Sequence, residues 1–298
     1  MHRTSCINGF IFISSWDKRK KIFFLINQID VSFILQIKLQ LKKYSFHKYQ
    51  GTGNDFVIID NRTQIFDNTN LDLVKKLCDR KFGIGADGLI LIENHNKLDF
   101  DLVYFNSDGS KSFCGNGSRC GVAFAKNLGI IENTTTFNAI DGIHTAQIKN
   151  DLVHLKMNDV EGIEKINNDF YLNTGSPHYN KFVENVTLID IISEAHSIRY
   201  NERFKSEGTN INFVERKDDG VEIRTYERGV EDETLSCGTG ATAVALTASN
   251  KFQFDSPIRV KVQGGELMIS FDKITDEKFE NIWLIGEAKH VFSGQITI

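Results

Sequence analysis

The chain has 298 residues, with 35 lysines and arginines against 39 acidic residues, a formal net charge of −4 and 41% hydrophobic residues. This composition is that of an ordinary globular protein, and it excludes a disordered or collagen-like chain. Because the chain lacks the basic excess that binding to a phosphate backbone requires, we expect no nucleic-acid partner and favour a small-molecule ligand.

The N-terminal stretch contains two apolar runs, at residues 10–13 and 22–26, separated by basic residues. Polar residues interrupt the second run well short of the roughly 18–20 apolar residues of a membrane helix, and no signal-peptide cleavage pattern follows. We therefore expect no membrane segment, and we interpret residues 1–38 as an extension without a functional role. Alternating apolar and polar residues from Leu39 to Phe46 predict a strand with which the folded protein begins.

A helix is predicted near residues 71–80 and a strand over residues 89–92, because apolar residues recur with helical and then extended spacing. The turn between them, residues 83–88, reads GIGADG and matches the dinucleotide fingerprint GxGxxG. A dinucleotide turn runs from a strand into a helix, whereas this one runs from a helix into a strand. We interpret it as a structural turn, and the alternative is that it borders the ligand.

Two segments of the chain resemble each other. Residues 114–119 read CGNGSR and residues 237–242 read CGTGAT, and each opens a short apolar helix. A strand is predicted before each, over residues 100–105 and 221–226.

The likeness extends beyond these segments. Each cysteine is followed at the same distance by a glycine turn between strands, at Gly142 and Gly265, and an asparagine precedes an earlier strand at Asn54 and Asn210. Three correspondences in the same order predict two pseudo-equivalent α/β units with a cleft between them. Cys114 and Cys237, one from each unit, would line that cleft.

The five cysteines form an odd set without a CxxC pair, in a chain too long to need disulfides: Cys6, Cys78, Cys114, Cys120 and Cys237. This usage favours a reducing cytoplasm. Outside the CGxG motifs we expect the cysteines to be inert packing residues. No metal is expected, because the candidate ligands His47, His144, His154 and His178 lack the spacing of known zinc motifs.

A cysteine just before Gly-x-Gly at a helix start is in a position where its thiol can act as a base. Free backbone N–H groups and the helix dipole would stabilise the thiolate and lower a pKa that is about 8.5 in the free residue. With two such cysteines facing each other, one thiolate can remove an α-proton from a gripped substrate while the opposite thiol protonates the other face. The expected result is stereochemical inversion without a cofactor, since converging amides would stabilise the enediolate.

Further motifs carry a resemblance: residues 51–56 read GTGNDF, residues 105–110 read FNSDGS and residues 226–229 read YERG. With the CGxG segments, they make residues 45–298 resemble the diaminopimelate epimerase family, cofactor-independent enzymes that convert LL-2,6-diaminopimelate to the meso isomer in lysine biosynthesis. The resemblance implies an α/β (α+β) fold of two pseudo-symmetric domains, each a mixed, mainly antiparallel sheet wrapped around a central helix. The expected domains are residues 39–156 plus 287–298, with the C-terminal strand returning to the first domain, and residues 157–286.

The resemblance also implies roles for individual residues. Cys114 and Cys237 would be the acid/base pair, with Cys237 accepting the proton of the LL isomer. The substrate-binding set would comprise a group at the reacting carboxylate and a group at the far end: Gly115, Asn116, Gly238 and Thr239, and Asn54, Asn106, Asn210, Glu227 and Arg228. His178 and Glu227 would adjust the thiol pKa values. Two positions depart from the common pattern, because Gly88 stands where many members have Gln and Ser176 where many have Asn.

Two alternatives remain at this point. The chain could be another two-cysteine amino-acid racemase or isomerase of the same fold, such as a proline-type racemase. A substrate with one amine and one carboxylate would, however, leave Glu227, Arg228 and the asparagines without a second polar end to bind. It could also be a catalytically silent small-molecule binding protein, although binding alone needs neither thiol. The sequence leaves a homodimer open, and we expect a cytoplasmic enzyme with diaminopimelate as its small-molecule partner.

Overall fold

The computed structural model describes residues 42–298, which fall into two units. The larger unit comprises residues 45–294, and the smaller one residues 42–44 with 295–298. Within the smaller unit, the backbones of Lys42 and Ile298 exchange two hydrogen bonds. The predicted extension, residues 1–38, lies outside the described residues, as do Cys6 and the start of the first predicted strand.

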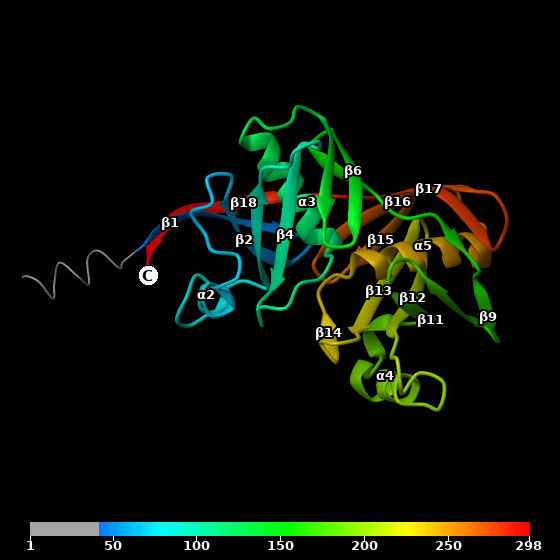
Figure 1. Ribbon diagram of the computed structural model, residues 1–298. Helices are drawn as coiled ribbons and strands as arrows, with labels where there is room; N and C mark the ends of the chain where they lie inside the picture. The colour runs from blue at the N-terminus through cyan, green and yellow to red at the C-terminus, as the bar shows by residue number, and fades with distance from the viewer. Residues whose placement is uncertain (1–41) are drawn as a thin grey trace, which may run out of the picture. The chain divides into compact units, whose positions relative to one another are not determined.

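The first half of the larger unit holds strands around a central helix (Figure 1). Its elements are β1 (Lys43–Gly51), β2 (Asn54–Asp60), α2 (Leu71–Cys78), β3 (Gly88–Glu93), β4 (Phe100–Asn106), α3 (Gly115–Asn127), β5 (Thr134–Ala139), β6 (Gly142–Lys149) and β7 (Leu152–Lys156). The α3 helix packs against β2, β3, β4, β6 and β7. Its buried residues include the glycines that follow Cys114, so the backbone itself lies in the core.

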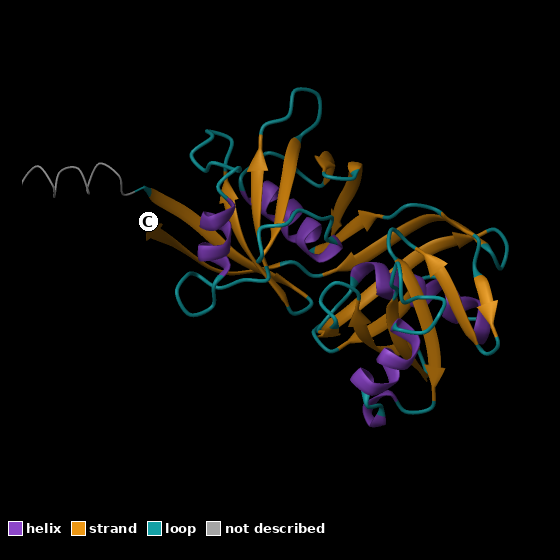
Figure 2. Cartoon of the chain, turned by 60° about the horizontal axis from the view of Figure 1, so that its bottom comes forward, coloured by secondary structure: helices purple, strands orange, loops and turns teal. Residues whose placement is uncertain are grey.

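The second half is built in the same way around α5. Its elements are β8 (Val160–Glu161), β9 (Glu164–Ile166), β10 (Asp169–Asn173), β11 (Pro177–Val183), the 3₁₀-helix η1 (Val186–Leu188), α4 (Ile191–Arg199), β12 (Asn210–Lys217), β13 (Gly220–Glu227), β14 (Asp232–Thr234), α5 (Gly238–Phe252), β15 (Ile258–Val262), β16 (Gly265–Lys273) and β17 (Lys278–Gly286). The last strand of the chain, β18 (Lys289–Thr297), follows β17. Strands outnumber helices in both halves, as Figure 2 shows. The C-terminal strand β18 pairs with β1.

The strand pairings repeat. In the first half β1 is antiparallel to β2, β2 parallel to β3, β3 antiparallel to β4, β4 parallel to β5, and β5, β6 and β7 follow as antiparallel neighbours. The series β10, β11, β12, β13, β15, β16 and β17 shows the same order of parallel and antiparallel pairs. The predicted repeat of a mixed sheet around a helix is therefore confirmed, while the proposed domain boundaries stay a prediction.

One correspondence within the predicted repeat is wrong. The sequence equated the strand after Asn54 with the strand after Asn210, but the pairing order equates β2 with β11 and β3 with β12. In the parallel pairs, Phe56 lies beside Gly88 as His178 lies beside Asn210. The two strands of each parallel pair start at the same edge of the sheet. An asparagine can therefore begin β2 in one half and β12 in the other, although these two strands are not equivalent. Asn210 is thus the counterpart of Gly88.

Candidate active site

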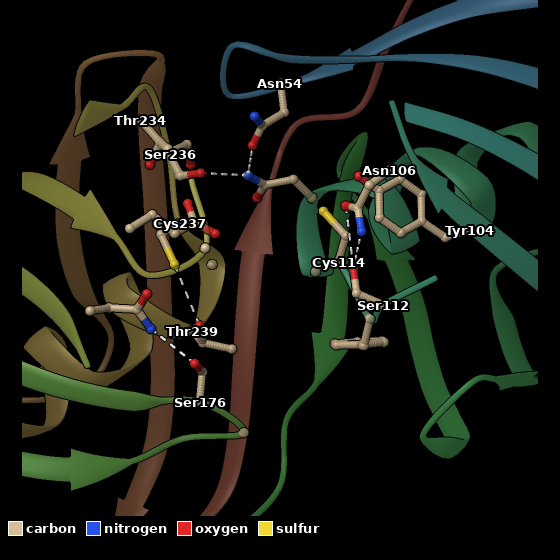
Figure 3. A pocket seen from close by; sticks show the side chains of 18 of the residues that line it. Asn54, Tyr104, Asn106, Ser112, Cys114, Ser176, Thr234, Ser236, Cys237 and Thr239 are labelled. Carbon is tan, nitrogen blue, oxygen red and sulfur yellow. Dashed lines mark hydrogen bonds between the residues drawn. The ribbon is translucent and has the colours of Figure 1, made fainter. Parts of the chain in front are cut away.

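The chain contains a cavity of about 970 Å³ lined by segments from both halves of the larger unit. Cys114 and Cys237 both line it, and Figure 3 shows them within this one pocket. All of the predicted substrate-binding residues line it as well: Asn54, Asn106, Gly115, Asn116, Asn210, Glu227, Arg228, Gly238 and Thr239. The structure therefore brings together residues that lie far apart in the sequence, and only His178 stands behind the wall, fully buried.

Each cysteine is the N-cap residue of its helix, Cys114 of α3 and Cys237 of α5, and both have extended backbones. The two helix starts meet. A Cβ added to Gly238 would lie 3.8 Å from the Cα of Gly115 and 3.7 Å from Asn116 Oδ1. Glycine permits this approach, and the first-turn amides of both helices, which have no partner within a helix, face the same region. Such paired helix starts suit a carboxylate.

The thiol pKa values differ from the sequence expectation. Burial raises the pKa of Cys114 to about 11, although the Gly117 amide, 3.4 Å from its Sγ, opposes the shift. Burial and then the charge of Glu227 raise the pKa of Cys237 to about 12. The expectation of lowered pKa values is therefore wrong for this structure, because loss of solvation outweighs the helix N-termini.

A chain of polar groups runs from Cys237 into the second half. The Thr239 hydroxyl lies 3.5 Å from Cys237 Sγ and 2.9 Å from His178 Nε2. Asn212 Nδ2, which can only donate, lies 3.2 Å from His178 Nδ1, so the ring proton sits on Nε2. Burial lowers the pKa of His178 to about 3, which makes the ring a neutral donor to Thr239. Thr239 is then free to donate to the sulfur.

A different network surrounds Cys114. Asn116 donates to Asn54 Oδ1 at 2.5 Å and to the Ser236 carbonyl at 3.2 Å. Arg119, fully buried on α3, donates to Asn116 Oδ1 at 2.9 Å and to Thr52 Oγ1 at 3.1 Å. Its charge has no carboxylate partner among residues 42–298, and its Nε has no hydrogen-bond partner. These bonds join the loop before β2, the start of α3 and the segment that leads to Cys237.

Two further asparagines that line the cavity, Asn106 and Asn210, form hydrogen bonds to other groups of the protein. Asn106 donates to Ser110 Oγ at 2.9 Å and to Ser112 Oγ at 3.1 Å. Asn210 donates to Ser176 Oγ at 2.9 Å and accepts from the Arg228 amide at 2.8 Å. The side-chain amide groups of both residues are thus largely occupied by protein partners.

Two charged residues differ from these asparagines. The exposed guanidinium of Arg228 donates to the Glu207 carbonyl at 3.0 Å and forms no ion pair within residues 42–298. It therefore keeps donors for a substrate carboxylate. Burial raises the pKa of Glu227, and its charge in turn raises the pKa of both thiols, which places this carboxylate close to the two sulfurs.

Sequence reasoning missed three residues that shape the cavity: Asp87, which accepts from Asn54 Nδ2 at 3.1 Å, Tyr104, which lines the wall, and Arg119. The only available signal was the charge of Arg119 within an otherwise small and apolar helix face. Asp87 belongs to the GxGxxG turn, which does connect a helix to a strand as predicted.

Within the described part of the chain, no helix combines the length and the apolar composition needed to cross a membrane. Among the same residues, no three His, Cys, Asp or Glu side chains are grouped so that they could hold a metal ion.

Comparison with solved structures identifies the fold. A crystal structure of a Bacillus anthracis phenazine biosynthesis protein of the PhzF family is 14% identical, with a TM-score of 0.68 over 86% of this chain and 100% of that one. A hydroxyproline epimerase from Agrobacterium vitis is 12% identical, with a TM-score of 0.58 over 86% and 93% of the two chains. At these identities the likeness shows the fold alone, and it confirms the predicted fold class.

Sequence comparison is more specific. The family model described as diaminopimelate epimerase matches residues 46–161 and 170–291. The diaminopimelate epimerase of Flavobacterium psychrophilum is 54% identical over 255 residues, covering 84% of this chain and 99% of that protein. That of Aquifex aeolicus is 39% identical over 277 residues, covering 85% and 97%. The chain belongs to the diaminopimelate epimerase family.

Proposed function

We propose that this protein interconverts LL- and meso-2,6-diaminopimelate by a two-base mechanism in which Cys114 and Cys237 act on opposite faces of the α-carbon. The observation that carries the proposal is the meeting of two helix starts, each capped by a cysteine, at one cavity. Membership of an isomerase family supports the reaction class. A catalytically silent binding protein would need neither thiol.

The α-carboxylate of the substrate would dock on the free amides at the two helix starts, those of Gly115, Asn116, Gly238 and Thr239. This places the α-carbon between the two sulfurs. The thiolate of Cys237 takes the α-proton of the LL isomer, and the C–H electron pair passes into the carboxylate to form an enediolate that the amides stabilise. The Cys114 thiol then protonates the opposite face, and the two residues exchange roles in the reverse direction.

One cysteine must become a thiolate when substrate binds. The neutral His178 donates to the Thr239 hydroxyl, and that hydroxyl donates to Cys237 Sγ, which favours the charged form of the thiol. Glu227 opposes it until the substrate ammonium group pairs with that carboxylate. Binding of the correct substrate would thus remove a barrier to thiolate formation.

The far end of the substrate carries a second carboxylate and a second ammonium group. Arg228, with free guanidinium donors, would hold the carboxylate. Asn210 would act by holding Arg228 and Ser176 in place, because its own side chain is already bonded to the protein. Asn54 and Asn106 would complete this end from the first half. The proposed cellular setting is lysine biosynthesis in the cytoplasm, and a homodimer stays untested.

The direct test uses purified protein in D₂O with LL-diaminopimelate and without added metal or pyridoxal phosphate. Deuterium should enter the α-position as the LL and meso isomers interconvert, which proton NMR and chiral chromatography would follow. L-proline in a parallel sample should show no exchange. Activity that disappears with a chelator and returns with metal, or exchange of proline alone, would contradict the proposal.

A further inference from the structure

Behind Tyr104, which lines the cavity, lies a buried glycine whose side-chain space is already filled. Gly88 begins β3 between the parallel β2 and the antiparallel β4. A Cβ added to Gly88 would overlap Tyr104 Cε2 and crowd the Phe105 carbonyl, and it would lie 2.8 Å from Tyr104 Oη. The ring of Tyr104 therefore occupies the space that any side chain at position 88 would use.

The second half of the molecule shows what the equivalent position does there. Asn210, the counterpart of Gly88, begins β12 and presents a polar side chain to the cavity. In the repeated strand order, β13 is the counterpart of β4. Thr225 lies two residues before the end of β13, where it is buried and donates to Asn212 at 2.8 Å. Tyr104 lies at the same position of β4, and it does line the cavity. The polar group thus comes from a different strand in each half.

The phenol of Tyr104 is packed on its apolar side and free at its polar end. Its ring meets Phe56 edge to face, with centroids 5.9 Å apart, and only 8% of the residue is exposed. Its hydroxyl forms no hydrogen bond with the protein within residues 42–298. Buried tyrosine hydroxyls usually have a partner, so the open side of the cavity is where this partner belongs.

The surroundings of the hydroxyl keep it neutral. Burial raises the pKa of Tyr104 above its usual value, and charges on Cys114, Asp87, Cys78 and Glu227 act in the same direction. The hydroxyl is therefore available as a neutral donor or acceptor near the reacting thiol. Figure 3 shows Tyr104 on the same side of the pocket as Asn106 and Cys114.

We propose that Tyr104 is a substrate-binding residue whose hydroxyl forms a hydrogen bond with a charged group of bound diaminopimelate. The glycine at position 88 leaves the space that the Tyr104 ring needs for this contact. The inference rests on the proposed function and adds a specificity residue to it. It also gives Gly88 and Tyr104 a joint role, since neither the ring position nor the contact is compatible with a side chain at position 88.

Tyr104→Phe tests the contact, because it removes the hydroxyl and keeps the ring on Phe56. We expect KM for LL-diaminopimelate to rise by about tenfold, the order expected for a hydrogen bond to a charged group, with kcat within about twofold of the parent. The thermal unfolding midpoint should not fall, because the hydroxyl has no protein partner to lose. A lowered midpoint with an unchanged KM would show a structural role and overturn the inference.

Tyr179→Phe is the matched control. Its hydroxyl donates to Asp169 at 2.9 Å, away from the cavity, so this variant should keep the parent KM while losing some stability. A Tyr104→Phe protein with the parent KM would refute the substrate contact even though the parent epimerises. A parent protein that neither epimerises nor exchanges diaminopimelate would instead refute the proposed function, and the two failures are thus distinguishable.

A binding measurement separates recognition from chemistry. In a Cys114→Ala/Cys237→Ala background, calorimetry with meso-diaminopimelate should give a Kd that rises by about the same factor when Tyr104→Phe is added. An equal Kd with and without the hydroxyl would contradict the contact, whatever the kinetic values are.

Discussion

The two cysteine sites share a backbone plan and differ in their side chains. Both cysteines cap a helix that begins with Gly-x-Gly, and each helix is the central helix of one half of the molecule. The Cys114 sulfur accepts from the amide of Gly117 within its own cap. The Cys237 sulfur forms no cap bond at hydrogen-bond distance, although the Gly240 amide lowers its pKa, and it faces the Thr239 hydroxyl. The backbone of the site is therefore duplicated, while its chemistry is not.

The residues that follow each cysteine explain the difference. On α3, Asn116 and Arg119 reach Thr52 and Ser236, which belong to other segments of the site. On α5, the Thr242 hydroxyl only bonds back to the Gly238 carbonyl of its own helix, at 3.0 Å. The first site thus carries the bonds that fix the two helix starts together, and the second carries the groups that act on its own thiol.

The largest effect should come from removing either sulfur. Cys114→Ala and Cys237→Ala should each lower the rate of LL-to-meso conversion by at least about a thousandfold, because inversion requires one base and one acid on opposite faces. Chiral chromatography of the product gives the rate. Cys120→Ala, which removes a buried sulfur just beyond the site on α3, is the control and should stay active; a fully active Cys114→Ala or Cys237→Ala would show that the two sites are not both used.

Substitutions at the sixth position of each motif, Arg119 and Thr242, test the structural half of the comparison. Arg119→Met should lower kcat by roughly 10- to 100-fold, because Asn116 and Thr52 lose the donor that fixes the helix starts and small displacements are costly in catalysis. Arg119→Lys should recover part of this loss, which a purely structural effect on folding would not show. Thr242→Val, at the equivalent position on α5, should change kcat by less than about threefold. Equal losses in the two variants would contradict the assigned division of roles.

A pH profile of thiol modification tests the electrostatic half. Alkylation by iodoacetamide requires the thiolate, so its rate at each cysteine should rise with pH up to about 11 for Cys114 and about 12 for Cys237. Glu227→Gln removes a negative charge that raises both pKa values, and both cysteines should therefore react faster at pH 8. Peptide mass spectrometry resolves the sites, and Glu233→Gln, at another cavity residue, serves as control. Unchanged reactivity in Glu227→Gln would place the carboxylate away from the sulfurs.

The smallest and most selective effect is expected at Thr239. Its hydroxyl lowers the pKa of Cys237 and is absent from the causes that act on Cys114. Thr239→Val should therefore slow alkylation of Cys237 by a few-fold and leave that of Cys114 unchanged. Equal slowing at both cysteines would mean that the substitution disturbs the whole cavity rather than one thiol.

Much of this arrangement could be predicted from the sequence. The CGxG segments identify both helix starts, since the cysteine and the two glycines are adjacent in the chain and fix a local conformation. Arg119 and Tyr104 could not be assigned, because Arg119 reaches Thr52 in the turn before β2, and Tyr104 meets Phe56 and Gly88 on other strands, only in the folded protein. The thiol pKa values were predicted in the wrong direction for a related reason: a helix start can be read locally, but burial cannot.

The central claim is that each thiol serves one face of the substrate, and deuterium exchange by the single variants tests it most directly. Cys114→Ala retains Cys237 and should exchange the α-proton of LL-diaminopimelate with D₂O without inverting it, while leaving the reacting centre of the meso isomer unlabelled. Cys237→Ala should show the reverse pattern, and the double variant should exchange neither isomer. If one single variant exchanges both isomers, or if either inverts the α-carbon at a rate near that of the parent, the two facing thiols do not divide the reaction between them.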